Sequence, residues 1–258
     1  MIDANKLKKI KESTNTYNIY IEDDYLYMIR YDDYKEQIEK TKRLHEKGVN
    51  FAGPISQMKL DDKKVVVEEY LAKGTSFEKM KDEYRFTSSL DSKKLLEEYE
   101  DFFNIYLEEI RLRAEADQTT YDKLFNDIKE MNKENLTVDI CSVGNLFFDK
   151  NVGFSIIDAY PGATIPDIKE LFHMIIGNIP NMKCIDNKQS IENCVPQKYY
   201  DEFLTYIGII KNKYKNAIQN ERVNIQYEDY PIKPNVVTSD VIDNLIEKDI
   251  NTKIVLGF

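Results

Sequence analysis

Cysteine and histidine are scarce in this chain of 258 residues, which contains three cysteines and two histidines. A small, odd number of cysteines argues against a disulfide framework and indicates a reducing compartment, although Cys184 and Cys194 could pair. His45 and His173 are the only imidazoles, and the cysteines are not paired at ligand spacing. A structural zinc site is therefore not expected, whereas magnesium held by oxygen ligands remains compatible with the composition.

Long apolar runs are also missing, since no stretch approaches the roughly eighteen apolar residues of a membrane span. We therefore expect a cytoplasmic protein with no membrane partner. The formal net charge of −10 disfavours binding to nucleic acid, whose phosphates require a basic surface. The hydrophobic content of 42% is enough for a substantial core, in one large domain or in two closely joined lobes.

The first seventy or so residues have the pattern of β-strands interrupted by one helix. Residues 17–30 contain two runs of aromatic and β-branched residues around a polar turn, which is typical of a β-hairpin. Residues 34–47 are charged and precede Gly48, as in a helix that ends at a glycine. Residues 55–71 contain two more β-like runs, so the expected order is β-β-α-β-β.

The rest of the chain is predicted to be mainly helical. From Ser92 onward apolar residues recur at a spacing of three and four, which predicts a long amphipathic helix, and a second helix covers residues 121–131. Two short apolar runs between residues 136 and 158 predict a small hairpin. Residues 199–214 carry a further apolar stripe, and a short helix is expected at residues 241–247.

The most specific chemical pattern runs from Gly144-Asn145 through Leu-Phe-Phe-Asp-Lys-Asn-Val-Gly-Phe-Ser-Ile-Ile to Asp158. This segment and the order of parts before it resemble the protein kinase and aminoglycoside phosphotransferase superfamily, over most of the chain. The resemblance implies an α+β, two-lobed protein kinase-like fold. The N-lobe would cover residues 1–72, with a small antiparallel β-sheet and one helix. The larger, mainly helical C-lobe would cover residues 73–258, with a catalytic-loop-like hairpin at 136–160.

The same resemblance implies catalytic and metal-binding roles. Asn145 and Asp158 would bind Mg²⁺, which favours oxygen ligands and keeps positions open for phosphates. Ile140 takes the place of the family's catalytic aspartate, and Asp139 precedes it as a candidate base or substrate orienter. Adjacent side chains of a strand point to opposite sides, so Asp139 would need a local bulge or shift to act there. The alternative is that Asn145 is a turn residue and Asp158 a helix cap or surface carboxylate.

Further residues are implied to bind the nucleotide. Arg30 falls where the family's strand-borne lysine reaches the phosphates, and its partner on the next helix would be Glu39 or Glu36. Those glutamates could equally be solvated helix charges. Glu69 and Leu71 lie in the expected hinge, whose backbone would face the adenine, and the alternative is an ordinary edge strand.

The glycine-free segment 9–20 occupies the place of the family's phosphate-covering loop. The hydroxyl groups of Ser13, Thr14 and Thr16 could donate to phosphate, and an ordinary polar turn is the alternative.

The resemblance implies an atypical phosphotransferase that uses ATP and Mg²⁺, with the nucleotide bound in the interlobe cleft. The γ-phosphoryl group would pass to a hydroxyl of an unspecified protein or small molecule. Ile140, Arg30 and the glycine-free segment favour instead a pseudokinase, acting as a nucleotide-binding or scaffolding module. A mixed α+β domain of unrelated function is the third hypothesis.

Overall fold

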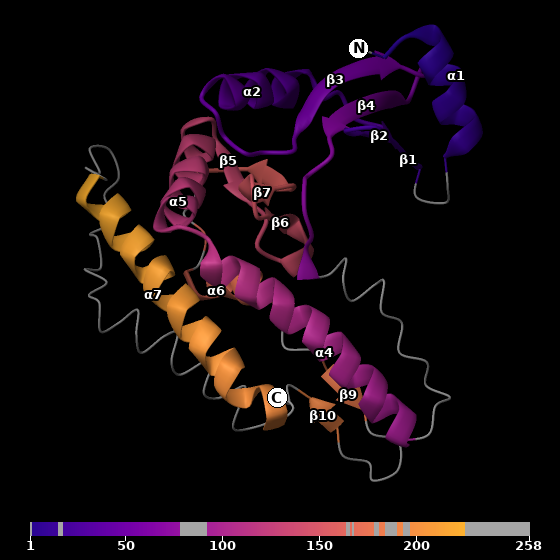
Figure 1. Ribbon diagram of the computed structural model, residues 1–258. Coiled ribbons are helices and arrows are strands. Elements are labelled where there is room, and N and C mark those ends of the chain that lie inside the picture. The colour runs from indigo at the N-terminus through magenta and orange to yellow at the C-terminus, as the bar shows by residue number, and fades with distance from the viewer. Residues whose placement is uncertain are drawn as a thin grey trace. The chain divides into compact units, whose positions relative to one another are not determined.

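The computed structural model describes residues 2–14, 18–77, 92–163, 166, 168–177, 181–183, 190–192 and 197–224. Within these ranges the protein is α+β, with six α-helices and a small antiparallel sheet (Figure 1). The predicted α+β class is therefore confirmed. The predictions for Thr16, for a Cys184–Cys194 pair and for a helix at 241–247 lie outside the described residues.

Four N-terminal strands form the antiparallel sheet, in the spatial order β1-β2-β4-β3. They are β1 Ile19–Glu22, β2 Tyr25–Arg30, β3 Pro54–Lys59 and β4 Val65–Tyr70. Helix α2 (Lys35–Glu46) connects β2 to β3 and ends before Gly48, whose φ of +75° lies in the left-handed region that favours glycine. The predicted order β-β-α-β-β is confirmed.

Helix α1 (Ala4–Ser13) precedes these strands and was not predicted. Asp3 caps it, because its side chain accepts a hydrogen bond of 2.8 Å from the backbone N–H of Lys6. Ile10 is buried in a cluster with Tyr27 of β2 and Val66 of β4, so α1 covers one face of the sheet. The expectation of one helix in this region was wrong. A lysine-rich segment has good helix propensity even with few apolar residues, and packing of its narrow apolar face on the sheet stabilises the helix.

The remaining helices follow the predicted pattern. The helix expected from Ser92 and the one expected at residues 121–131 are present, and the stripe at residues 199–214 lies in the last described helix. These elements are α4 Ser92–Glu115, α5 Gln118–Lys133, α6 Ile168–Ile176 and α7 Tyr200–Asn224. Two short strands, β9 Asn181–Lys183 and β10 Ser190–Glu192, pair between α6 and α7.

Residues 136–161 form two short sheets rather than one hairpin. Strand β5 (Leu136–Val138) pairs with β8 (Ala159–Pro161), while β6 (Leu146–Asp149) pairs with β7 (Gly153–Ile156). The β6–β7 turn is held by the Asp149 carboxylate, which accepts from the amides of Asn151 and Val152 at 2.8 and 3.1 Å. The predicted hairpin would pair β5 with β7 across a long loop. The β6–β7 turn closes a much shorter loop, which costs less conformational entropy, so β7 pairs with β6.

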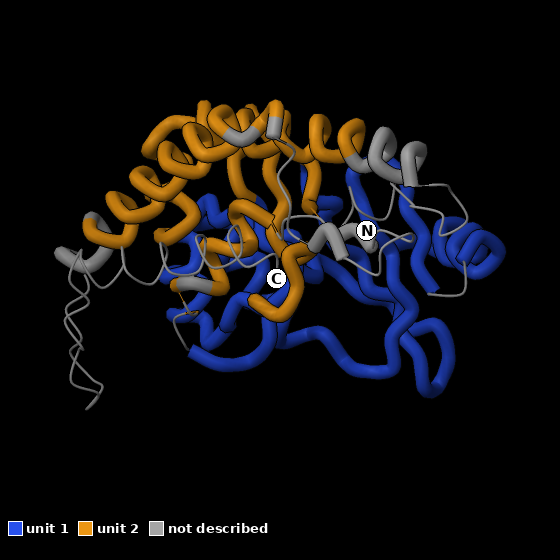
Figure 2. Tube along the Cα trace, turned by 90° about the horizontal axis from the view of Figure 1, so that it is seen from below, with its two compact units in different colours: residues 1–73, 127–139, 155–165 blue, residues 74–126, 140–154, 166–258 orange. Residues whose placement is uncertain are grey.

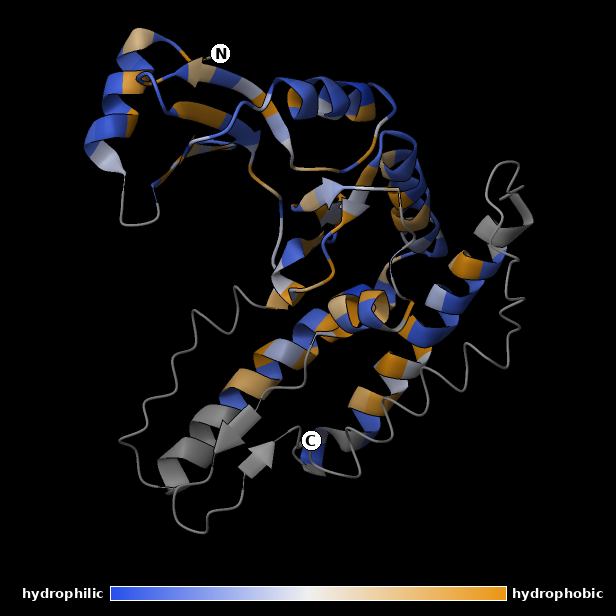
Figure 3. Ribbon diagram, turned by 180° about the vertical axis from the view of Figure 1, so that it is seen from behind, coloured by the Kyte–Doolittle hydropathy of each residue, from blue (hydrophilic) through white to orange (hydrophobic). Residues whose placement is uncertain are grey.

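Helices α4 and α7 pack against each other and share an apolar core. Figure 3 shows hydrophobic and hydrophilic residues interleaved along both helices, as amphipathic helices require. Phe103 and Tyr106 of α4 and Phe203 of α7 are buried, and the rings of Phe103 and Phe203 are 5.9 Å apart. Among the described helices, none combines the length and the apolar content needed to cross a bilayer.

The chain divides into two compact units (Figure 2). The first consists of residues 1–73, 127–139 and 155–165, and the second of residues 74–126, 140–154 and 166–258. The first unit therefore contains the whole predicted N-lobe together with two segments that the sequence assigned to the C-lobe.

Backbone hydrogen bonds explain why those segments join the first unit. The amide of Ala52 donates to the carbonyl of Ile156 at 2.8 Å, and the amide of Ile156 donates to the carbonyl of Asn50 at 3.0 Å. The amide of Asn50 donates to the Asp127 carboxylate at 3.1 Å. These bonds link the connection after α2 to β7 and α5 within the first unit.

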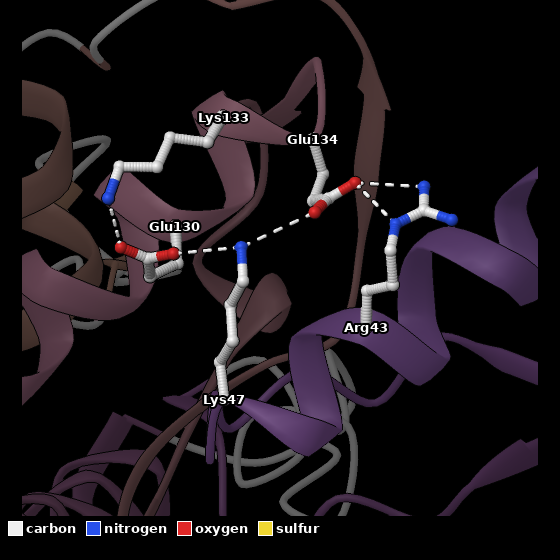
Figure 4. Close-up of polar contacts among 5 residues, drawn as sticks. All are labelled: Arg43, Lys47, Glu130, Lys133 and Glu134. Atoms are coloured by element: carbon white, nitrogen blue, oxygen red, sulfur yellow. Dashed lines mark hydrogen bonds and ion pairs between the residues drawn. The ribbon is translucent and has the colours of Figure 1, made fainter.

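Ion pairs also hold α2 to the C-terminal end of α5 (Figure 4). Arg43 contacts Glu134 at 2.9 Å, and Lys47 contacts Glu130 at 3.0 Å and Glu134 at 3.4 Å. Lys133 pairs with Glu130 as well. The two glutamate side chains are only 15% and 14% exposed, so this network is less screened by solvent than ordinary surface pairs.

Candidate functional site

Two aspartates face each other at the end of the β5–β8 ladder. Val138 pairs with Ala159, and the amide of Asp139 donates to the carbonyl of Asp158 at 3.1 Å, so the ladder continues by one residue pair. Directly opposite residues of an antiparallel ladder project to the same side, with Cβ atoms about 4.5–5.5 Å apart. Burial and then the charge of Asp139 raise the pKa of the Asp158 carboxyl, as expected for neighbouring acids.

Arg30 and Glu69 share one face of the N-terminal sheet. Leu26 pairs with Glu69 and Arg30 pairs with Val65 across β2 and β4, so Arg30 and Glu69 project to the same side. Arg30 is exposed, and its Nη2 donates to the sulfur of Met28 at 2.8 Å. The guanidinium lowers the pKa of Glu69 and of Asp158, although other effects outweigh it. Arg30 therefore lies within electrostatic range of both carboxyls.

The carboxyl of Glu69 has the most perturbed titration of this group. Burial raises its pKa from 4.5 to about 7, the charge of Asp158 adds to the rise, and Arg30 opposes it. Glu69 is consequently part protonated at neutral pH. Strongly shifted carboxyls with a named charge partner are concentrated at functional sites, although structural networks produce them too.

Tyr34 lies within electrostatic range of the same charged groups and was not predicted from the sequence. Its backbone N–H donates to the Gln57 side chain at 2.8 Å just before α2 begins. Burial raises the pKa of its phenol, with smaller effects from the charges of Arg30, Glu69 and Asp158 among others. A tyrosine in a polar connection carries no signal that would have identified it. We refer to Arg30, Tyr34, Glu69, Asp139 and Asp158 as the charge cluster; all five belong to the first unit.

The charge cluster offers an arginine for anions and carboxylates for cations. A guanidinium can bind phosphate through two parallel hydrogen bonds, and Mg²⁺ is commonly held by one or two carboxylates together with phosphate oxygens and water. Within the described ranges, no group of three or more His, Cys, Asp or Glu side chains is arranged to hold a metal ion. The Asp139–Asp158 pair supplies two carboxylates of this kind.

The two glutamates considered as partners of Arg30 are paired within their own helix. Glu39 contacts Lys42 at 2.8 Å, and Glu36 contacts Lys40 at 2.8 Å. Both carboxylates are exposed, and hydrogen bonds from these lysines lower their pKa values. These contacts fit solvated helix charges, the alternative that the sequence left open.

The expected hinge lies at the end of an interior strand. β4 is flanked by β2 and β3, so the alternative of an ordinary edge strand is wrong. The N–H of Leu71 donates to the carbonyl of Asp24 at 2.8 Å, which engages one of the backbone donors expected to face the adenine.

Ser13 and Thr14 lie at the end of α1. Ser13 is its last residue and is exposed, while the amide of Thr14 donates to the carbonyl of Ile10 at 3.0 Å. They therefore terminate a helix, and the segment before them is not the loop that the sequence suggested.

Asn145 belongs to the second unit. It ends the short 3₁₀ turn Val143–Asn145, where the Ser142 hydroxyl accepts from the amide of Gly144 at 3.0 Å. The amide of Asn145 donates to the carbonyl of Ser142 at 3.1 Å. The thirteen-residue spacing to Asp158 was the signal for a shared metal site, and that pairing stays a prediction.

Comparisons with known proteins assign no family to this geometry. No family model, no curated protein and no solved structure matches the chain. The functional assignment therefore depends on the charge cluster and on the order of the elements around it.

Proposed function

We propose that this protein is an atypical phosphotransferase of the kinase-like type that uses ATP and Mg²⁺. The observation that carries the proposal is the cross-strand pair Asp139–Asp158 within electrostatic range of Arg30. Two carboxylates and one guanidinium in a single compact unit suit a cation that is bound together with its phosphates.

Three members of the charge cluster, Arg30, Asp139 and Asp158, have a role in this proposal. Arg30 binds phosphate oxygens, and its permanent charge offsets the charge that develops during transfer. Asp158 and Asp139 would hold the cation, whereas a metal-binding role of Asn145 stays an expectation of the resemblance. The two carboxylates would hold Mg²⁺, whose positive charge would offset the charge on the transferred group.

Asp139 also orients the acceptor hydroxyl or takes its proton. Its pairing opposite Asp158 supports this role, because opposite residues of an antiparallel ladder project to the same side. Loss of a well-placed general base typically lowers rates by about 10²–10⁴-fold. With Ile140 at the position of the usual aspartate, we expect slow transfer.

The order of elements supports the kinase-like assignment. The chain runs β-β-α-β-β, then through two long helices, and then through the β6–β7 turn between Asn145 and Asp158. This is the order of parts on which the resemblance depends. The unpredicted helix α1 is the main departure from it.

The second candidate is a pseudokinase that binds nucleotide or a protein partner without transfer. Three observations favour it: Glu36 and Glu39 pair with lysines of their own helix, the Leu71 amide donates to Asp24, and α1 stands in place of the expected loop. Each removes a contact that an active site of the proposed type would use.

A thermal-shift titration followed by a transfer assay separates these candidates. A ligand that binds only the folded state stabilises it by about 2.7 kcal/mol at a hundredfold excess over Kd. Stabilisation by ATP and Mg²⁺ with transfer to protein or water supports the phosphotransferase, and stabilisation without transfer supports the pseudokinase. No stabilisation by any nucleotide would leave a scaffolding module that binds a protein partner, or the unrelated α+β domain.

The site assignment is tested with Asp158→Ala and the exposed control Glu36→Gln. We expect transfer to disappear in Asp158→Ala and to persist in Glu36→Gln, whose exposed carboxylate pairs with Lys40 of α2. Unchanged transfer in Asp158→Ala rejects the assignment.

A further inference from the structure

The side chain of Gln57 in β3 binds the segment that leads into helix α2. Its oxygen accepts a hydrogen bond of 2.8 Å from the backbone N–H of Tyr34, and its nitrogen donates to the Asp33 carboxylate at 2.6 Å. One side chain therefore engages two consecutive residues. Hydrogen bonds from Gln57 and from Lys35 lower the pKa of Asp33, so this carboxylate is ionised at neutral pH and is a strong acceptor.

Gln57 lies on the face of the sheet that carries Arg30. Val67 of β4 pairs with Gln57 on one side and with Met28 of β2 on the other, so the three side chains project to the same side. Arg30 lies two residues beyond Met28 along β2 and projects to that side as well. Gln57 therefore holds the backbone of Tyr34 on the side of the sheet where Arg30 lies.

The phenol of Tyr34 is half-buried and lies within electrostatic range of Arg30. Burial raises the pKa of this phenol, and the guanidinium of Arg30 opposes the rise. The hydroxyl consequently keeps its proton at neutral pH and is a neutral hydrogen-bond donor. Among the residues that the structure describes, none hydrogen-bonds to this hydroxyl, and none forms an ion pair with Arg30.

A guanidinium and a hydroxyl that can both donate suit a phosphate group. The guanidinium supplies charge and paired N–H groups that match phosphate oxygens, and the hydroxyl supplies one further donor. Hydrogen bonds to charged groups are stronger than those between neutral groups, so the hydroxyl gains most from an ionised acceptor. The carboxylates of Asp139 and Asp158 would repel a free phosphate, so the phosphate must arrive together with a cation.

We propose that Tyr34 is a further phosphate-binding residue of the charge cluster and that Gln57 is the residue that positions it. The Tyr34 hydroxyl donates to an oxygen of the phosphate chain that Arg30 binds. Gln57 fixes the backbone from which the phenol extends. The inference rests on the proposed function, because its ligand is the ATP and Mg²⁺ of that proposal.

The test compares the affinity for ATP, with Mg²⁺ present, in Tyr34→Phe and in the control Tyr31→Phe by isothermal titration calorimetry. Tyr34→Phe keeps the ring, and we expect binding to weaken about tenfold, the effect of losing one hydrogen bond to a charged group. Inorganic triphosphate with Mg²⁺ should lose the same factor, because the hydroxyl contacts the phosphates. Tyr31 is 69% exposed and its ring lies 5.4 Å from the Lys64 ammonium, so Tyr31→Phe should bind as the wild type does.

The role of Gln57 is tested by a double-mutant cycle of Gln57→Met and Tyr34→Phe. Methionine has a similar length, but it forms neither of the two hydrogen bonds. Gln57→Met should weaken ATP binding in the wild type and have no further effect in Tyr34→Phe, because its effect passes through the Tyr34 hydroxyl. Equal effects in both backgrounds would show a merely structural role and overturn the positioning by Gln57.

Arg30→Gln separates a failure of this inference from a failure of the proposed function. If Arg30→Gln weakens ATP binding and Tyr34→Phe does not, the inference is overturned and the proposed function stands. An equal loss in Tyr31→Phe also overturns it, and so does a loss for ATP without a loss for inorganic triphosphate, since the hydroxyl would then contact the nucleoside. Absence of ATP binding by the wild type overturns the proposed function and with it this role of Tyr34.

Discussion

Replacement of Glu69 by glutamine should change how the stability of the protein depends on pH. Glu69 lies on the Arg30 face of the sheet, and burial together with the charge of Asp158 raises its pKa to about 7. Glutamine has nearly the same shape and carries no ionisable proton. The substitution therefore isolates the effect of ionising one partly buried carboxyl.

The direction follows from the proton balance. Below about pH 4.5 the side chain is protonated in the folded and the unfolded chain alike. Between that pH and about 7 the folded protein retains a proton that the unfolded chain has released, so the free energy of unfolding falls as the pH rises. The difference between pKa values of 4.5 and about 7 corresponds to a loss of up to about 3 kcal/mol above neutrality.

Urea unfolding at a series of pH values measures this effect. The wild type should lose stability relative to Glu69→Gln between about pH 5 and about pH 8. Glu39→Gln is the control, because that exposed carboxylate pairs with Lys42 and its pKa is lowered rather than raised. If the difference in the free energy of unfolding between wild type and Glu69→Gln stays constant over this pH range, the burial of Glu69 and its charge partner are refuted as causes of a raised pKa.

Two further predictions concern packing and ion pairs. Gly74→Ala should destabilise the protein by at least about 1 kcal/mol in urea unfolding, because its φ is positive and the Phe148 carbonyl fills the space. Gly208→Ala, in an open helical position, should be neutral or stabilising, and equal effects would contradict the clash. A double-mutant cycle of Arg43→Ala and Glu134→Ala should give a favourable coupling free energy that weakens with salt, and zero coupling at low salt would show that this pair does not hold α2 to α5.

The local pattern of the chain was sufficient for most elements. Alternating and three-to-four spacing predicted the strands around residues 17–30 and the helix that starts at Ser92, because both features depend on neighbours in sequence. Helix α1 was not predicted, because only a few apolar residues of this segment pack on the sheet. Tertiary packing, rather than propensity, selects such a helix.

The site depended on pairings between distant segments. The alternation of side chains within one strand predicts that Asp139 and Ile140 point to different sides. Only the β5–β8 register shows that Asp139 faces Asp158. The raised pKa of Glu69 likewise depends on burial by segments far away in sequence. Away from this site, the complete burial of Arg113 in α4 could not be predicted either, because arginine in an amphipathic helix is normally assigned to the solvent side.

The most direct test of the account is a titration of Mn²⁺, as a substitute for Mg²⁺, monitored by electron paramagnetic resonance with ATP present. The wild type should bind protein-held Mn²⁺ only with ATP, and Asp139→Asn and Asp158→Asn should each weaken that binding. Glu36→Gln should bind as the wild type does. Mn²⁺ binding that needs neither ATP nor either aspartate, or no binding at all, would contradict the claim that these two carboxylates hold a nucleotide-bound cation.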